Sequence, residues 1–240
     1  MNLMIRDNFY PKLKNIYSDS SKTAFCLLKD QAANGYKNYS NRETLIYSSG
    51  LINLIWNRWN SFWRNYWIAN VIGGIGLDKK KLLPLKLYAD YSNLQVLCLM
   101  KDISNSTGSI KHKYGNSLKG GHEEITWGDA KKITNICSNL IKHSSDFGLS
   151  TMQIDKLDLI ISLLSTYKIY LDHCQQIRNT YMHLNEINIK DVLIPISSHY
   201  AFSGLKNNII NILGATHISD KTPCLVNISQ HMTAMIQAME

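Results

Sequence analysis

Residues 153–184 read QIDKLDLIISLLSTYKIYLDHCQQIRNTYMHL, and this stretch decides the fold. Its large apolar residues recur at steps of three or four, which is the spacing of a stripe along one face of an α-helix. The stripe consists of Ile154, Leu157, Ile160, Ile161, Leu164, Tyr167, Leu171, Cys174, Ile177, Tyr181 and Leu184. The sequence therefore predicts one long helix that buries this face.

A second strongly periodic segment lies before it, at 41–72, and the glycines of 73–76 are expected to end that helix. The apolar stretch 79–103 follows, but Pro84 and several β-branched or aromatic residues weaken its helix signal and leave its type open. The chain has only 4 prolines and 13 glycines, which favours long helices over an all-β fold.

The remaining segments complete an all-α prediction, a bundle of about five or six helices. Thr126, with Asp129 three positions later, predicts a capped helix that continues to about His143. Two further helices are expected near 201–213 and 225–239.

The predicted organisation is an N-terminal arm or first helix at 1–40, followed by one helical domain at 41–240. A polar, glycine-containing loop is expected at 104–122, and Pro195 is expected to end the connection after the long helix.

Composition places the chain among globular proteins, since 45% of its residues are hydrophobic and only 18% are charged. Its 5 cysteines are scattered and form no C-x-x-C pair, which favours reduced thiols in a cytoplasmic protein. No signal peptide is expected at the start of the sequence. Asparagines and arginines interrupt the apolar stretch 51–76, so neither a membrane-spanning segment nor a membrane partner is expected.

Charge is distributed unevenly along the chain. Residues 1–120 carry 17 Lys/Arg against 7 Asp/Glu, whereas residues 121–240 carry 9 against 11. A basic half suggests a surface for a polyanion, with nucleic acid as the first candidate. The alternative is that these charges only keep the protein soluble.

The long helix ends in a group of residues suited to phosphate chemistry. Arg178 is a permanent cation with forked donors that bind phosphate, and His183 can move protons near neutral pH. Asn179 and His183 face the same way, but Arg178 and His183 are about 140° apart around a straight helix. Either a kink or a second copy of the helix would be needed to bring Arg178 and His183 together, and the second solution implies a two-fold homodimer with a shared cleft.

Two further sets of side chains accompany this group. Tryptophans recur at helical spacing (Trp56, Trp59, Trp63 and Trp67), which is more typical of a core or dimer interface than of base stacking. The opposite face carries Asn53, Asn57, Asn60 and Arg64, which would either line a cleft beside the motif or face solvent. In the basic loop, the lysines Lys111, Lys113 and Lys119 would bind phosphates or only keep the loop soluble. The histidines have no metal-ligand spacing, so no metal and no cofactor are expected.

Arg178-Asn179-x-x-x-His183, late in a long helix, resembles the R-x(4–6)-H motif of the HEPN superfamily. The tryptophan-rich segment 56–64 resembles the first core helix of the longer prokaryotic members, and the resemblance covers about residues 40–240. It implies a HEPN-like helical bundle and a metal-independent endoribonuclease that cleaves RNA to 2′,3′-cyclic phosphate and 5′-hydroxyl ends.

The same resemblance suggests an effector of a bacterial toxin–antitoxin or anti-phage defence system, with an antitoxin or another regulator as a partner. In the predicted site, His183 transfers protons, Arg178 stabilises the phosphorane and Asn179 orients His183 or binds a phosphate oxygen. The RNA-binding residues would be Asn57, Arg64, Lys111, Lys113 and Lys119.

Three alternatives remain open at the level of sequence. The chain could be a non-catalytic HEPN-type scaffold that binds a partner protein, a nucleotide or RNA. It could also be a helical nucleic-acid-binding module without chemistry. In the third alternative, Arg178 pairs with an acid such as Asp172 or Glu186, and His183 is an ordinary interface histidine.

Overall fold

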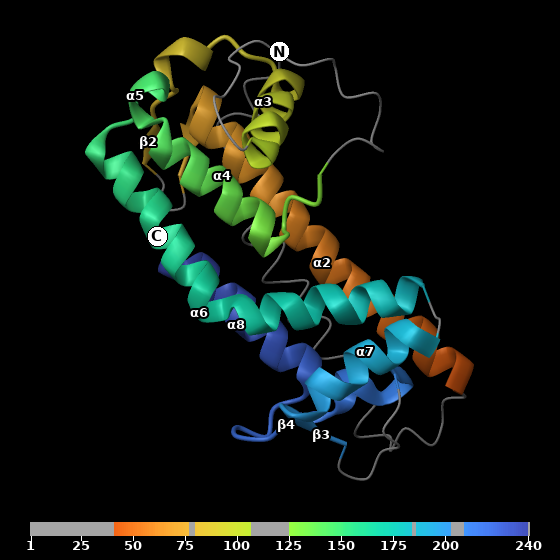
Figure 1. The fold of residues 1–240 in the computed structure, drawn as a ribbon. Coiled ribbons are helices and arrows are strands. Elements are labelled where there is room, and N and C mark those ends of the chain that lie inside the picture. The colour runs from red at the N-terminus through yellow and green to blue at the C-terminus, as the bar shows by residue number, and fades with distance from the viewer. Residues whose placement is uncertain (1–40, 77–79, 107–124, 184–185, 203–208, 240) are drawn as a thin grey trace. The chain divides into compact units, whose positions relative to one another are not determined.

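The computed structural model describes residues 41–76, 80–106, 125–183, 186–202 and 209–239. Helices dominate this part of the chain, and the strands form two small antiparallel pairs (Figure 1). The prediction of an all-α fold is therefore confirmed. Among the described helices, none is both long and apolar enough to cross a bilayer. The predicted arm at 1–40 and most of the predicted loop at 104–122 lie outside the described residues.

The α-helices are α2 (Asn41–Ile72), α3 (Asn93–Asn105), α4 (Ala130–Lys142), α5 (Ser144–Phe147), α6 (Thr151–Met182), α7 (Glu186–Ser197) and α8 (Cys224–Ala238). Strand β1 (Gly74–Ile75) pairs with β2 (Lys81–Leu82), and β3 (Tyr200–Ala201) pairs with β4 (Thr216–His217). Two 3-10 helices, η1 (Lys86–Tyr88) and η3 (Ile209–Gly214), complete the described elements.

The described residues divide into two compact units. The first unit contains Trp59–Thr166 and 235–239, and the second contains 41–58 and Tyr167–Ala234. Helices α2, α6 and α8 each contribute residues to both units.

The tryptophan stripe of α2 lies in the core, as its spacing favours. Trp59, Trp63 and Trp67 in the first unit are at most 1% exposed, and Trp56 in the second unit is 3% exposed. The rings of Trp59 and Trp63 meet edge to face with their centroids 5.7 Å apart. Such contacts stabilise a core beyond the burial of apolar area, so these rings are not available for stacking on bases.

Two polar contacts fix the turn that precedes α4 in the first unit. The Trp59 indole Nε1 donates to the Gly128 carbonyl oxygen over 3.0 Å, and the Gly128 N–H donates to Asn60 Oδ1 over 2.8 Å. Asn60, a member of the predicted amide row, therefore has a structural partner. Gly128 is the residue type that this close approach requires, because a Cβ there would lie 2.3 Å from Trp59 Cδ1.

Helices α3 and α4 of the first unit are joined through the C-terminal end of α3. Asn139 Nδ2 on α4 donates to the Ile103 carbonyl oxygen over 2.7 Å, and Asn135 Nδ2 donates to that of Ser104 over 3.2 Å. The last carbonyls of a helix have no partner within it. Side chains of α4 therefore supply the hydrogen bonds that α3 lacks.

The predicted stripe on α6 is largely confirmed. Ile160 and Leu164 are buried in the first unit, and Leu171, Cys174 and Ile177 are buried in the second. In the second unit, α6 shares the core with residues of α2, α7 and α8, among them Ile52, Ile55, Ile196, Ile228 and Met232.

Three predictions about individual segments are wrong. Asp129, and not Thr126, is the N-cap of α4, since its side chain accepts from the Lys132 N–H over 3.0 Å. No helix spans 201–213 in the described residues, because Ala201 belongs to β3 and 209–214 form a 3-10 helix. Pro195 lies inside α7 and does not end the connection that follows α6.

Two of these errors have a physical reason in the structure. Pro195 stands two residues before the end of α7, so little of the helix follows the one hydrogen bond that its missing N–H leaves unmade. Tyr200 pairs with His217, a strand partner that a local helical pattern cannot indicate. The open stretch 79–103 resolves into β2, η1 and α3, and Ser92 and Gln95 cap α3 reciprocally.

Candidate functional site

The last turns of α6 place Arg178 and Asn179 beside each other at the edge of the second unit's core. Ile177 and Tyr181 are buried, and they fix the rotation of the helix about its axis. Arg178 and Asn179 lie next to this buried stripe and are half-buried. The guanidinium NH1 of Arg178 donates to Asn179 Oδ1 over 3.0 Å.

Asn53 of α2 provides the second contact of the arginine. Arg178 Nε donates to Asn53 Oδ1 over 3.2 Å, although the two residues are 125 positions apart in sequence. The amide nitrogen of Asn53 donates to the Ser49 carbonyl oxygen over 2.8 Å and approaches Met182 Sδ at 3.5 Å. These contacts direct the Asn53 oxygen toward the guanidinium and fix its position between two helices.

The partners that the structure describes for Arg178 are neutral. Both oxygens that it contacts belong to amides. Burial raises the pKa of the neighbouring Cys174 thiol to about 12 despite the opposing charge of Arg178, so this sulfur carries no charge at neutral pH. Tyr181 is also buried, and its pKa is raised in the same way.

Asp172, one of the acids that could have neutralised the arginine, is occupied elsewhere. It forms an ion pair with Lys168, one turn earlier on α6. Among the side chains that the structure describes, no carboxylate forms an ion pair with Arg178; the side chain of Glu186, the other candidate acid, lies outside them. A half-buried guanidinium without a counter-charge is an electrostatically unfavourable arrangement unless an anion binds to it.

His183 follows the end of α6 and is exposed. Its backbone N–H still donates to the carbonyl oxygens of Asn179 and Thr180, over 3.0 and 3.3 Å. In the described residues no hydrogen bond joins His183 to Arg178 or to the side chain of Asn179. The structure therefore brings together Arg178, Asn179 and Asn53, and it leaves His183 at the surface one turn after Asn179.

Comparison with known proteins adds no further assignment. No family model, curated protein or solved structure matches this chain. The resemblance to the HEPN superfamily thus stays a prediction that depends on the motif and its helical context. Within the described residues, no group of three or more His, Cys, Asp or Glu side chains is arranged to hold a metal ion.

The structure describes two of the five predicted RNA-binding residues, and they belong to different units. Asn57 is exposed on α2, one turn after Asn53, so it lies on the side of the helix that carries the contact with Arg178. Arg64 is half-buried in the first unit, and the structure describes no site that it shares with Arg178. The three lysines of the basic loop, Lys111, Lys113 and Lys119, lie outside the described residues.

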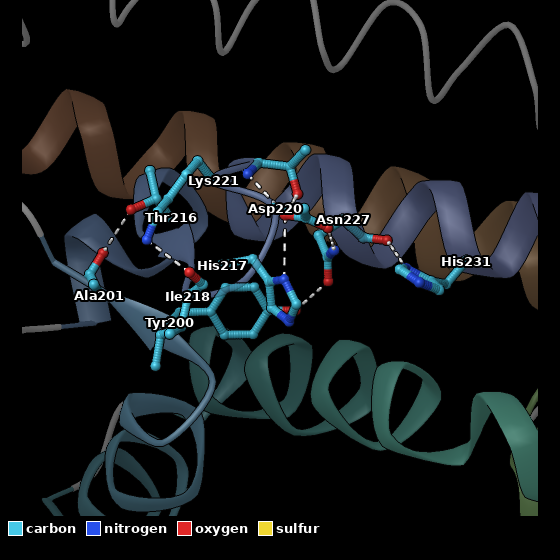
Figure 2. Close-up of polar contacts among 10 residues, drawn as sticks. Tyr200, Ala201, Thr216, His217, Ile218, Asp220, Lys221, Asn227 and His231 are labelled. Carbon is cyan, nitrogen blue, oxygen red and sulfur yellow. Dashed lines mark hydrogen bonds and ion pairs between the residues drawn. The ribbon is translucent and has the colours of Figure 1, made fainter.

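A second polar cluster in the second unit was not indicated by the sequence. Tyr200 Oη donates to Asn227 Oδ1 over 2.8 Å, and Asn227 Nδ2 donates to Asp220 Oδ2 over 3.0 Å (Figure 2). His217 Nδ1 lies 3.1 Å from Asp220 Oδ1, within ion-pair distance but without the alignment of a hydrogen bond. Burial by itself would raise the pKa of Asp220. Hydrogen bonds from Thr222 and the proximity of His217 outweigh this effect and hold that pKa below its usual range.

This cluster connects the β3–β4 pair to α8, and its other members are aromatic rings. His231 Nδ1 donates to the Asn227 carbonyl oxygen over 2.7 Å, and its ring stacks on Tyr170 of α6 with the centroids 3.6 Å apart. The arrangement is that of a structural network, because the Tyr200–Asn227 bond joins β3 to α8 and the stack of Tyr170 on His231 joins α6 to α8. The only sequence signal was the clustering of histidines in the C-terminal half, which carries no metal-ligand spacing.

Proposed function

We propose that the protein is a HEPN-type, metal-independent endoribonuclease that acts as a homodimer. The observation that carries the proposal is the state of Arg178, which two amide oxygens hold in place and no described carboxylate neutralises. Two of its N–H donors bond to these amides, and the remaining donors are left for an oxyanion. A phosphodiester is the ligand that such a forked cation suits best.

The chemistry follows from the side chains. The 2′-hydroxyl of RNA attacks the adjacent phosphorus, and His183 removes the proton or supplies one to the leaving 5′-oxygen, a contribution on the order of 10²–10⁴-fold. Arg178 stabilises the negative charge on the phosphorane oxygens. The products are a 2′,3′-cyclic phosphate and a 5′-hydroxyl, and DNA is resistant because it lacks the nucleophile.

The homodimer is proposed because one helix does not direct both groups at one phosphorus atom. Arg178 faces Asn53 within its own chain, whereas His183 is exposed beyond the end of α6. Two copies that meet at these helix ends would supply an arginine and a histidine to the same cleft. We also propose that the enzyme is an effector of a bacterial toxin–antitoxin or anti-phage system, with a regulator as its partner.

The deciding experiment incubates the purified chain with labelled RNA, and with DNA of the same sequence, in the presence of EDTA. We expect cleavage of RNA alone, with cyclic phosphate ends, and a loss of at least about 100-fold in Arg178→Ala and in His183→Ala. Lys142→Ala is the matched control, because it removes one exposed positive charge from the other unit. Cleavage that requires magnesium, or that survives both active-site substitutions, would contradict the proposal.

Two further measurements separate the parts of the proposal. Mixing Arg178→Ala with His183→Ala restores part of the activity only if each cleft combines residues of two copies. Expression of the wild type is expected to be toxic to bacteria, and His183→Ala is expected to relieve the toxicity. RNA binding that depends on Arg178 without any cleavage would instead favour a non-catalytic scaffold.

A further inference from the structure

The segment that follows β1 in the first unit exposes lysines and leucines together. Leu83 is 74% exposed and Leu87 is 65% exposed, and Lys80, Lys81 and Pro84 are also at the surface. We call these five residues the Lys–Leu edge. Single exposed leucines are ordinary, but two of them beside consecutive lysines form a surface that is both apolar and basic.

The exposure of these leucines is built into the fold. The Gly76 N–H donates to the Lys80 carbonyl oxygen over 2.8 Å, and Ile75 pairs with Lys81 in the β1–β2 ladder. Beyond the ladder, the Leu85 N–H donates to the Val71 carbonyl oxygen over 2.9 Å, and the Leu85 side chain is buried. The backbone is thus anchored on both sides of Leu83, so this side chain is presented at the surface by a fixed segment.

A second anchor lies beyond the edge. Tyr88 is 2% exposed, and its N–H donates to the Leu85 carbonyl oxygen over 2.8 Å. Leu87 therefore projects outward between two buried residues of a tight 3-10 turn. Because both leucine side chains are exposed, they are suited to insertion into the apolar region of a lipid bilayer.

We propose that the Lys–Leu edge binds the surface of an anionic lipid bilayer. Leu83 and Leu87 would enter the boundary between headgroups and acyl chains, while Lys81 would lie among the lipid phosphates. Shallow apolar insertion combined with attraction to anionic headgroups is the general basis of peripheral membrane binding.

Nucleic acid fits this edge less well. Residues 80–87 read KKLLPLKL and contain no aromatic side chain on which a base could stack. Contact with RNA phosphates would use the lysines and leave both leucines in water. The proposal concerns attachment to one face of a bilayer. It departs from the expectation of no membrane partner, which followed from the lack of a spanning segment.

The test is flotation of the full chain with vesicles of phosphatidylcholine alone or of equimolar phosphatidylcholine and phosphatidylglycerol. We expect binding to the anionic vesicles only, weakened by high salt. The double variant Leu83→Ser/Leu87→Ser keeps every charge, and we expect it to weaken vesicle binding by at least about tenfold. Ile194→Ser is the matched control, because Ile194 is also 74% exposed and lies in the second unit.

The outcomes are distinct from those of the nuclease assay. Wild-type protein that does not float with anionic vesicles overturns the proposal, as does a double serine variant that floats equally well. If the serine variant loses RNA affinity and the wild type ignores vesicles, the edge is a nucleic-acid surface and the bilayer proposal fails. Both substitutions are at exposed positions, so the double variant is expected to fold. Thermal unfolding checks this.

Discussion

At the scale of single residues, Asn53 determines the charge environment of Arg178 as well as its position. An amide oxygen accepts the guanidinium N–H and leaves the positive charge available. A carboxylate in the same place would form a charge-assisted pair with similar geometry and would occupy that charge. Replacing Asn53 by Asp would therefore keep the orientation of Arg178 and remove its free positive charge.

Asn53→Asp is expected to lower RNA cleavage by at least about tenfold while leaving the protein folded, because the new ion pair offsets the lost hydrogen bond to the Ser49 carbonyl oxygen. Cleavage falls because the new carboxylate competes with the phosphate for Arg178. Asn70→Asp is the matched control, because Asn70 lies on the same helix and makes the same bond, to the Tyr66 carbonyl oxygen four residues earlier. Cleavage rates and thermal unfolding check the prediction, and full activity of Asn53→Asp would contradict the role given to Arg178.

Two glycines provide a second residue-scale prediction. Gly128→Ala would place a Cβ 2.3 Å from the buried Trp59 ring, and overpacking of this kind costs about 1–3 kcal/mol of unfolding free energy. Gly50→Ala has nothing within 4 Å and lies in α2, so it is expected to stabilise by about 0.5–1 kcal/mol. Urea unfolding measures both changes, and changes of the same sign would contradict the packing described around Trp59.

At the scale of elements, the start of α4 shows which of two candidate residues caps a helix. Asp129 accepts from the Lys132 N–H, and Thr126 is exposed three residues earlier. Asp129→Ala is expected to lower the unfolding free energy by about 0.5–2 kcal/mol, whereas Thr126→Ala is expected to have little effect. Chemical denaturation of the two variants measures this difference. An equal loss in both would show that the helix begins earlier.

The helices that the sequence predicted well are those whose signals are local. The bounds of α2 follow from its period and from the glycines after Ile72, and α6 lies within two residues of its expected ends. The β3–β4 pair could not be predicted in the same way, because Tyr200 meets His217 through strand pairing between residues that are distant in sequence. The N-cap of α4 was misplaced because Thr and Asp are both good caps, and their spacing alone does not select between them.

At the scale of the whole molecule, the candidate site depends on a contact between distant parts of the sequence. The polar side of α2 was expected to line a cleft or to face solvent, and Asn53 does contact Arg178. Spacing along α2 cannot tell which amide of the row meets α6, because that depends on how the two helices rotate against each other. Asn60, from the same row, instead holds the turn at Gly128.

Stability as a function of pH is a second property of the whole molecule, and His173 is the group expected to control part of it. This side chain is 4% exposed on α6, and its Nδ1 has no hydrogen-bond partner in the described residues. Burial lowers its pKa to about 4, and His199 and His217 act in the same direction while Asp172 opposes them. The centroid of the His199 ring lies 5.2 Å from that of His173.

The sign of the effect follows from proton binding. The unfolded chain binds a proton at His173 near its ordinary pKa of about 6.5, whereas the folded chain resists protonation until about pH 4. The contribution of neutral His173 to the unfolding free energy is therefore fully present above about pH 6.5, and it is lost as the pH falls toward 4. By pH 5 the loss is expected to be about 2 kcal/mol of unfolding free energy. His173→Phe keeps an aromatic ring against Tyr200 but cannot bind the proton, so its stability should fall less between pH 7 and pH 5. Urea unfolding of the two proteins at a series of pH values measures this difference, and parallel curves over that interval would show that His173 titrates normally in the folded state.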